Sequence, residues 1–289
     1  MPVAFLSAVR LFFHRRTLTD FRRITNRILA TAKHGRIGIR AFEAHLPGIA
    51  KQIRQDGRSS WLDNWGHSLN VDEHEAAPIV DPKLLNVIGR LAQHPIRDGR
   101  SYHAGLIHTY GYLLSNLKTR FGYKRQRWLD GLIEQSLQLE RGVLSTDPPQ
   151  GTLLQNVTYL ISQIASDAKP INSAPETIPA SLLRLNLASF RITRIVEKVQ
   201  LGRSRSLLKV QTDIVHFRSG CPLESFLVYS IEQRRKRQLI TCFPMRKQHV
   251  QQLVSDAERN DTPIRPRFNL AVPDFPKSGI MGKRTVEQR

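Results

Sequence analysis

The sequence predicts an α+β protein, with a helical N-terminal and middle part followed by a mostly antiparallel β-sheet. Apolar residues recur at helical spacing between residues 80 and 167. Residues 168–179 hold three prolines in twelve positions, and beyond them the apolar residues alternate with a period of two. We therefore expect a helical domain at 80–167 and an antiparallel β or α+β domain at 180–275.

In the helical domain, Asp81-Pro82 introduces the first helix, since aspartate caps helix starts and proline suits the first helical position. The cleanest apolar pattern follows Gly151-Thr152, and either residue could cap it. Apolar residues at helical spacing predict helices around 84–91, 102–118, 128–137 and 153–164.

In the sheet domain, the strands are bounded by turn-forming residues, as expected of antiparallel hairpins. The last of four clear strands is joined to its predecessor by a basic hairpin, residues 233–237. A short helix at 246–258 and a further strand at 264–275 are expected to follow. Alternating apolar residues predict the four strands at 190–201, 206–217, 225–232 and 238–244.

The remaining segments are expected to lie outside the two domains. Residues 1–40 carry nine basic residues and a single acid, with apolar residues on one helical face near the start. Three interpretations stay open: an organellar targeting segment, a basic arm on an anionic surface, or a start codon placed too far upstream. Residues 41–80 are interpreted as an irregular linker, and 276–289 as a disordered tail.

The net charge of +20 is distributed unevenly. Basic and acidic side chains number 12 and 3 in residues 1–60, 11 and 12 in 61–180, and 21 and 9 in 181–289. Both flanks are therefore strongly basic, which favours binding to phosphate backbones or anionic surfaces. Because 32 of the 44 basic residues are arginine, a general preference for arginine would also explain the charge.

Residues 101–128 concentrate histidine and tyrosine, and they predict a candidate enzyme site. His103 and His108 would stand about 140° apart on a helix, so they cannot share a metal ion. A general-base histidine with tyrosine donors and a basic anion clamp is chemically reasonable, although domain interfaces also collect such residues. The candidate catalytic residues are His103, His108, Tyr110, Tyr112 and, from a strand of the sheet domain, His216.

The basic hairpin is the sharpest candidate for contact with nucleic acid, although basic residues also protect sheet edges from aggregation. Aromatic residues are not interleaved with the basic run, so we expect phosphate contacts rather than base stacking. The candidate nucleic-acid-binding residues are Arg234, Arg235, Lys236 and Arg237 in the hairpin, and Lys124, Arg125 and Arg127 in the helical domain.

The sequence indicates neither metal nor cofactor. Cys221 and Cys242 lack partners at metal-ligand spacing and cannot build a disulfide framework, which favours a reducing compartment. No segment approaches the length of a membrane-spanning helix. We expect an intracellular, cytoplasmic protein, unless residues 1–40 direct import into an organelle. The oligomeric state stays open.

The predicted function is binding of a polyanion, RNA or DNA, through phosphate contacts. The alternative is a metal-independent enzyme with its His/Tyr site between the helical and sheet domains.

Overall fold

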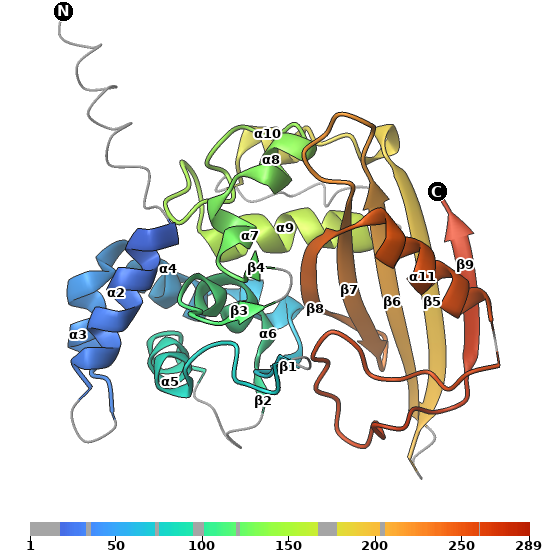
Figure 1. The fold of residues 1–289 in the computed structure, drawn as a ribbon, viewed down its shortest axis with the longest axis horizontal. Helices are drawn as coiled ribbons and strands as arrows, with labels where there is room; N and C mark the ends of the chain where they lie inside the picture. The colour runs from blue at the N-terminus through green and yellow to red at the C-terminus, as the bar shows by residue number, and fades with distance from the viewer. Residues whose placement is uncertain are drawn as a thin grey trace, which may run out of the picture.

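The computed structural model confirms the α+β fold class, with helices in the first part of the chain and a five-stranded antiparallel sheet in the second (Figure 1). Among the residues described, no helix combines the length and apolar character that crossing a membrane requires. The structure describes residues 18–32, 36–72, 75–94, 101–119, 122–166, 178–202, 206–259 and 261–289.

The elements follow one another in the order predicted for an α+β chain. The helices and helical turns are α2 (Leu18–Ala30), α3 (Ile39–His45), α4 (Pro47–Gly57), η1 (Ser60–Asn64), α5 (Pro82–Leu91), α6 (Ala104–Leu106), η2 (Ile107–Gly111), α7 (Gln126–Leu129), α8 (Leu132–Ser136), α9 (Leu153–Ala165), α10 (Ala180–Leu183), η3 (Leu187–Ser189) and α11 (Lys247–Glu258). The strands are β1 (His67–Leu69), β2 (Ser101–His103), β3 (Lys118–Thr119), β4 (Gly122–Tyr123), β5 (Arg191–Leu201), β6 (Ser206–His216), β7 (Ser225–Gln233), β8 (Lys236–Met245) and β9 (Lys283–Gln288).

The large sheet lies between two layers. Its strand order is β8-β7-β6-β5-β9, and every neighbouring pair is antiparallel. Apolar residues of one face, such as Val215 and Val228, share a buried cluster with α9 and the other helices of the first half. Apolar residues of the opposite face, such as Ile214, pack with α11. The helical part and the sheet therefore share one continuous core (Figure 1).

The predicted helices around α5 and α9 and at 246–258 are confirmed, as are the four predicted strands. Asp81 accepts a 2.8 Å hydrogen bond from the backbone nitrogen of Lys83, so it caps α5 as its position predicts. The Thr152 hydroxyl accepts from the backbone nitrogen of Gln155 at 3.1 Å, so Thr152 rather than Gly151 caps α9.

The prediction that residues 1–40 lie outside the core is wrong for residues 18–30, because helix α2 packs in the core. Helix α2 buries Phe21, Thr25 and Ile28 at 0–1% exposure, on one face of the helix. Its arginines lie on the opposite, exposed face. Residues 1–17, which include the apolar start of the predicted arm, lie outside the described residues.

The prediction of an irregular linker at 41–80 is also wrong, since most of this segment is helical. It contains the rest of α3, all of α4 and the turn η1. Trp65 follows η1 and is 3% exposed, and its indole nitrogen donates a 2.8 Å hydrogen bond to the hydroxyl of Thr158 on α9. The segment therefore packs as part of the helical layer.

The prediction of a disordered tail at 276–289 is wrong as well, because residues 283–288 form strand β9 at the edge of the sheet. Arg284 on β9 forms a buried ion pair with Glu197 on β5, with 2.8 Å between Nε and Oε1. The strand predicted at 264–275 does not form. Within that range the structure shows only isolated bridges, at Ile264 and Leu270.

The helix predicted at 102–118 is shorter and differently wound. Residues 101–103 pair as β2 with β1, and the helical segment consists of α6 and the π-helical turn η2. A Cβ atom on Gly105 would lie 2.9 Å from the ring of Trp65, so glycine permits the close packing of this segment. The helix predicted at 128–137 is interrupted at Gly131, which has a left-handed φ of 71°.

Candidate functional site

The structure divides the predicted His/Tyr site among separate environments. His103, His108 and Tyr110 lie within eight residues of one another, yet each side chain contacts a different part of the molecule. The change from strand β2 to the π-helical turn η2 directs these side chains apart. They do not converge on one cleft of the described structure, and each has its own surroundings.

His103 is half-buried beside the exposed His67 and His94. Its Nε2 is 3.1 Å from the carbonyl oxygen of Leu62, and its ring stands 5.2 Å from that of His94 and 6.2 Å from that of His67. Burial, reinforced by the two neighbouring histidines, lowers the pKa of His103 to about 3, so the ring is neutral near pH 7. Within the described part of the chain, no group of three His, Cys, Asp or Glu side chains is arranged to hold a metal ion.

Tyr110 faces the helices instead of the sheet. Its hydroxyl donates a 2.6 Å hydrogen bond to Oδ2 of Asp56, which is fully buried. Asp56 also accepts hydrogen bonds from Thr152 at 2.7 Å and Gln155 at 3.2 Å. Burial outweighs these three donors and raises the pKa of Asp56 to about 6. This network joins α4, η2 and α9, and it has the character of a structural element.

His108 forms the contact that most resembles a catalytic pair. Its Nε2 lies 3.1 Å from the hydroxyl of Ser68, and its Nδ1 lies 3.2 Å from that of Thr241 on β8. The Ser68 hydroxyl also donates to the carbonyl of Leu69 at 3.2 Å, so it accepts from the histidine N–H, the reverse of base activation.

The His108 pair is also closed to solvent. Ser68 is 0% exposed and His108 is 2% exposed. Burial lowers the pKa of His108 well below its ordinary range, and the charges of Arg127 and Lys124 lower it further. A neutral, fully hydrogen-bonded imidazole in this position links η2 to the edge of the sheet.

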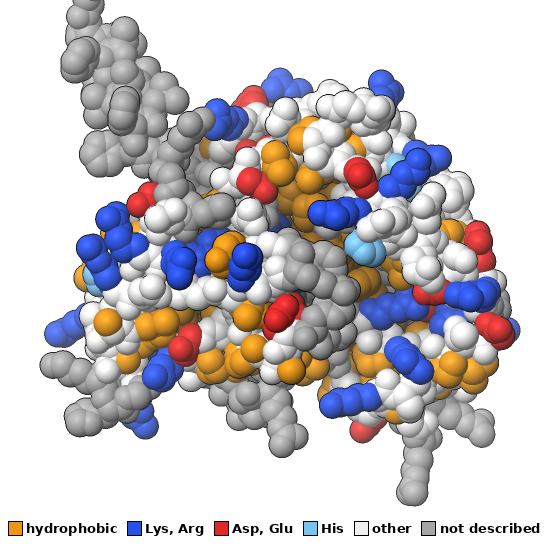
Figure 2. Space-filling view, viewed as in Figure 1, with side chains coloured by type: hydrophobic (Ala, Val, Ile, Leu, Met, Phe, Trp, Pro, Cys, Tyr) orange, Lys and Arg blue, Asp and Glu red, His pale blue; other side chains and the backbone are white. Residues whose placement is uncertain are grey.

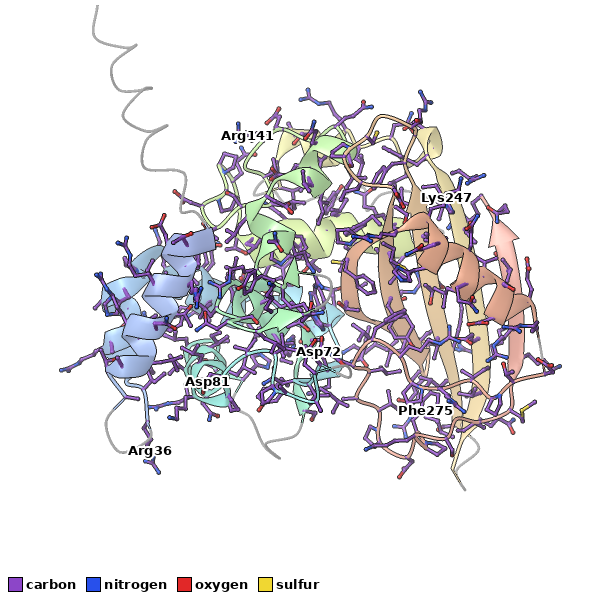
Figure 3. All side chains as sticks on the ribbon, viewed as in Figure 1. Arg36, Asp72, Asp81, Arg141, Lys247 and Phe275 are labelled. Atoms are coloured by element: carbon purple, nitrogen blue, oxygen red, sulfur yellow. The ribbon has the colours of Figure 1, made fainter. Side chains whose placement is uncertain are left out.

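Tyr112 and Arg127 form a cation–π pair beside His108. The Tyr112 ring stands 4.7 Å from that of His108, and the Arg127 guanidinium carbon lies 5.0 Å from the centroid of the Tyr112 ring. The same guanidinium lies 5.8 Å from the ring of Phe243 on β8. Lys124 lies nearby, with its Nζ 3.6 Å from Oδ2 of Asp72. Asp72 is labelled in Figure 3, where the helical part meets the sheet.

Arg125 lies inside the protein. It is 1% exposed, and its guanidinium donates hydrogen bonds to the carbonyl of Ser115 and the side chain of Asn116. The structure therefore does not place Arg125 on a surface that a polyanion could reach, in contrast to its predicted role.

His216 is separated from the other candidates. Its Nε2 lies 2.8 Å from the hydroxyl of Thr193 on β5, which also donates to Gln288 on β9. Burial lowers its pKa, and so does the charge of Arg191. His216 thus belongs to the β6–β5–β9 side of the sheet, whereas His108 contacts the opposite edge strand, β8.

The basic hairpin forms as predicted, with a two-residue turn. Gln233 pairs with Lys236, and the intervening Arg234 and Arg235 have φ angles of 52° and 65°. Positive φ at both central residues is the type I′ geometry that matches strand twist. Arg234, Arg235 and Lys236 are all exposed, and within the described residues none of them pairs with a carboxylate. We call these three residues the hairpin tip.

Arg237 has a different role from the hairpin tip. Its guanidinium donates to the carbonyl of Ala165, the last residue of α9. The same carbonyl accepts from Gln211 at 2.8 Å and from Arg194 at 3.2 Å. Cations and donors stabilise the carbonyls that a helix leaves unpaired at its C-terminus. Sequence reasoning missed this arrangement, because nothing in the local pattern relates α9 to these strands.

A further basic surface that the sequence did not single out lies on α2. Its exposed face carries Arg22, Arg23 and Arg27 beside a shallow groove. On the face shown in Figure 2, Lys and Arg side chains lie both over the α2 end and over the sheet, with Asp and Glu side chains among them. The hairpin tip is distinguished by three consecutive exposed cations at one two-residue turn, none of which pairs with a carboxylate in the described structure.

Comparison of the chain with protein-family models, curated proteins and solved structures finds no match. Any functional conclusion thus depends on the geometry described above.

Proposed function

We propose that this protein binds a polyanion, RNA or DNA, through phosphate contacts made by the hairpin tip. The observation that carries the proposal is the presentation of Arg234, Arg235 and Lys236 at the end of a two-stranded ribbon without a carboxylate partner among the described residues. Glu232, the nearest acid along the hairpin, pairs with Lys209 at 3.5 Å instead. Three such cations at one point favour a phosphate backbone as ligand.

The backbone of the turn supports a functional interpretation of its sequence. Left-handed residues cost about 1–2 kcal/mol each when they carry a side chain, so type I′ turns favour Asn-Gly or Gly-Gly. Arginine at both positions therefore lowers the stability of the turn, and it places two guanidinium groups in solvent. Such strain is commonly kept where a side chain is needed for binding.

The composition of the rest of the molecule agrees with this proposal. The net charge of +20 favours association with polyanions at low salt. The arginine face of α2 offers additional phosphate contacts at a second place on the surface. In contrast, the division of the His/Tyr residues into separate buried contacts gives no support to an enzyme site between the two parts of the protein.

The proposal is tested by measuring the affinity of the full-length protein for labelled RNA and duplex DNA at several salt concentrations. The affinity should fall steeply with salt, and the variant R234E/R235E/K236E should bind more weakly and with a smaller salt slope. On duplex DNA the slope should decrease by about 0.9 for each phosphate that the variant no longer neutralises.

The matched control is R218E/R246E/K247E, which changes the net charge equally with exposed residues. These residues lie at the opposite end of the sheet from the tip, because β8 runs from the turn toward α11. Equal reductions of affinity in both variants, or no binding at low salt, would contradict a role for the hairpin tip.

A further inference from the structure

Arg127 is a half-buried cation that has no ion-pair partner among the described residues. Its Nη1 is shielded from solvent and makes no hydrogen bond within the described structure, and no described carboxylate lies within ion-pair distance of its guanidinium. The aromatic rings of Tyr112 and Phe243 attract the charge but satisfy none of its N–H donors. A shielded N–H of a cation without an acceptor is costly, since buried polar groups are normally hydrogen-bonded.

Two fully buried arginines, Arg194 and Arg284, show how the fold satisfies shielded guanidinium groups elsewhere. Arg194 pairs with Asp213 at 2.5 Å, and Arg284 pairs with Glu197 at 2.8 Å. Each of these guanidinium groups also donates to a backbone carbonyl. Within the described chain, Arg127 has neither a carboxylate nor a carbonyl partner of this kind, and its Nη1 is shielded from solvent.

A second cation adds to the positive potential at this place. Burial, and then the charge of Arg127, lower the pKa of Lys124, so the two groups lie close enough to repel each other. Oδ2 of Asp72 lies 3.6 Å from Nζ of Lys124, whereas no described carboxylate lies within ion-pair distance of Arg127. His108 contributes no charge, because burial and both cations keep it neutral.

We infer that Arg127 and Lys124, beside the ring of Tyr112, bind the oxyanion group of a small ligand, a phosphate or a carboxylate. The planar guanidinium suits two parallel hydrogen bonds to such a group, and the ammonium of Lys124 supplies a second charge. The Lys124 side chain is 23% exposed, so the site reaches the surface. This site differs from the hairpin tip. It would hold a single anionic group beside aromatic rings, whereas the exposed cations of the hairpin tip would contact a phosphate backbone.

The test uses thermal unfolding of the full-length protein with inorganic phosphate or acetate, at an ionic strength held constant with chloride. We expect a saturable rise in Tm with one of the two anions, since a ligand bound only by the folded state stabilises it. The stronger response identifies a phosphate or a carboxylate as the preferred group.

The variants are R127M, which keeps an unbranched side chain beside the rings, and R127K, which keeps only the charge. In R127M the anion concentration for the half-maximal shift should rise about tenfold or more, and R127K should lie between R127M and the wild type. R141M, which removes an exposed arginine, is the control and should respond as the wild type does.

The inference is overturned if neither anion gives a saturable shift, or if R127M responds as strongly as R141M. Should R127M fail to fold, K124M gives the answer. A weakened response in K124M supports the site, and an unchanged response overturns it.

Discussion

The hydroxyl of Tyr110 lies 2.6 Å from a carboxylate oxygen of Asp56, fifty-four residues earlier in the chain. This contact connects α4, in the predicted linker, with η2, in the predicted enzyme site. Thr152 and Gln155 complete the network from the start of α9. A single buried carboxylate thus holds three helical elements together.

Asp56 should make stability depend on pH. Its folded-state pKa of about 6 lies above the ordinary 3.8, so the folded protein takes up a proton between these values and the unfolded chain does not. Raising the pH from 4 to 7 should therefore lower the free energy of unfolding by about 2 kcal/mol through this group. Urea unfolding of the wild type and D56N across this range checks the prediction.

Asn cannot ionise, so the contribution of Asp56 is the pH-dependent difference between the two proteins. Other groups act on both proteins equally and cancel in this comparison. A constant difference from pH 4 to 7 would show that Asp56 stays ionised in the folded protein.

Removing Asp213 alone should lower the free energy of unfolding more than replacing both members of its ion pair by apolar residues. Asp213 and Arg194 are 0% and 3% exposed, and burial raises the pKa of Asp213 despite the attraction of Arg194. D213A leaves a buried guanidinium without its carboxylate, which should cost about 3–5 kcal/mol. The double variant R194M/D213L should be less destabilised than D213A, as denaturant unfolding will measure. Additive destabilisation would contradict a coupled pair.

Stability and binding should change in opposite directions at the hairpin tip. The double variant R234N/R235G replaces two left-handed arginines by residues that suit a type I′ turn. It should raise the free energy of unfolding by about 1–2 kcal/mol and weaken binding to nucleic acid. The control R218Q/R246Q removes the same charge without changing the turn. A stable variant with wild-type affinity would argue against phosphate contacts at the tip.

Strand β9 should depend on Gly282. A Cβ atom at this position would lie 2.3 Å from the carbonyl oxygen of Lys198, so alanine must push β9 away from β5. G282A should cost about 1–3 kcal/mol and expose the backbone amides of 283–288 to hydrogen exchange. G48A is the matched control, because a Cβ there meets nothing within 4 Å. Equal protection of β9 in both variants would contradict the close approach of Gly282 to β5.

The periodicity of apolar residues correctly predicted the elements that are packed on two sides. Helix α9 spans 153–165 against a predicted 153–164, because its apolar residues must face both the helices and the sheet. The same spacing is present in α2, at Phe21, Thr25 and Ile28, but the surrounding arginines favoured an arm. Strand β9 carries little apolar pattern, since its stability depends on pairing with β5 and on the ion pair of Arg284.

The candidate site was harder to predict, because its geometry depends on small changes of winding. The expected α-helix would have set His108 and Tyr112 on one face, and the structure does bring their rings within 4.7 Å. The π-helical turn and β2 send Tyr110 and His103 elsewhere. A one-residue change of winding moves a side chain to another face, so spacing alone could not place these groups.

By itself the sequence determined the fold class, the basic flanks and the hairpin with its cationic tip, because periodicity, charge and turn geometry are local properties. Only the tertiary structure decided which cations reach solvent. Arg237 and Arg125 are bound to carbonyls of α9 and of the chain near η2, whereas Arg234 and Arg235 remain in solvent. The physical reason is that a partner for a buried charge comes from wherever the fold brings an oxygen close, which no local pattern records.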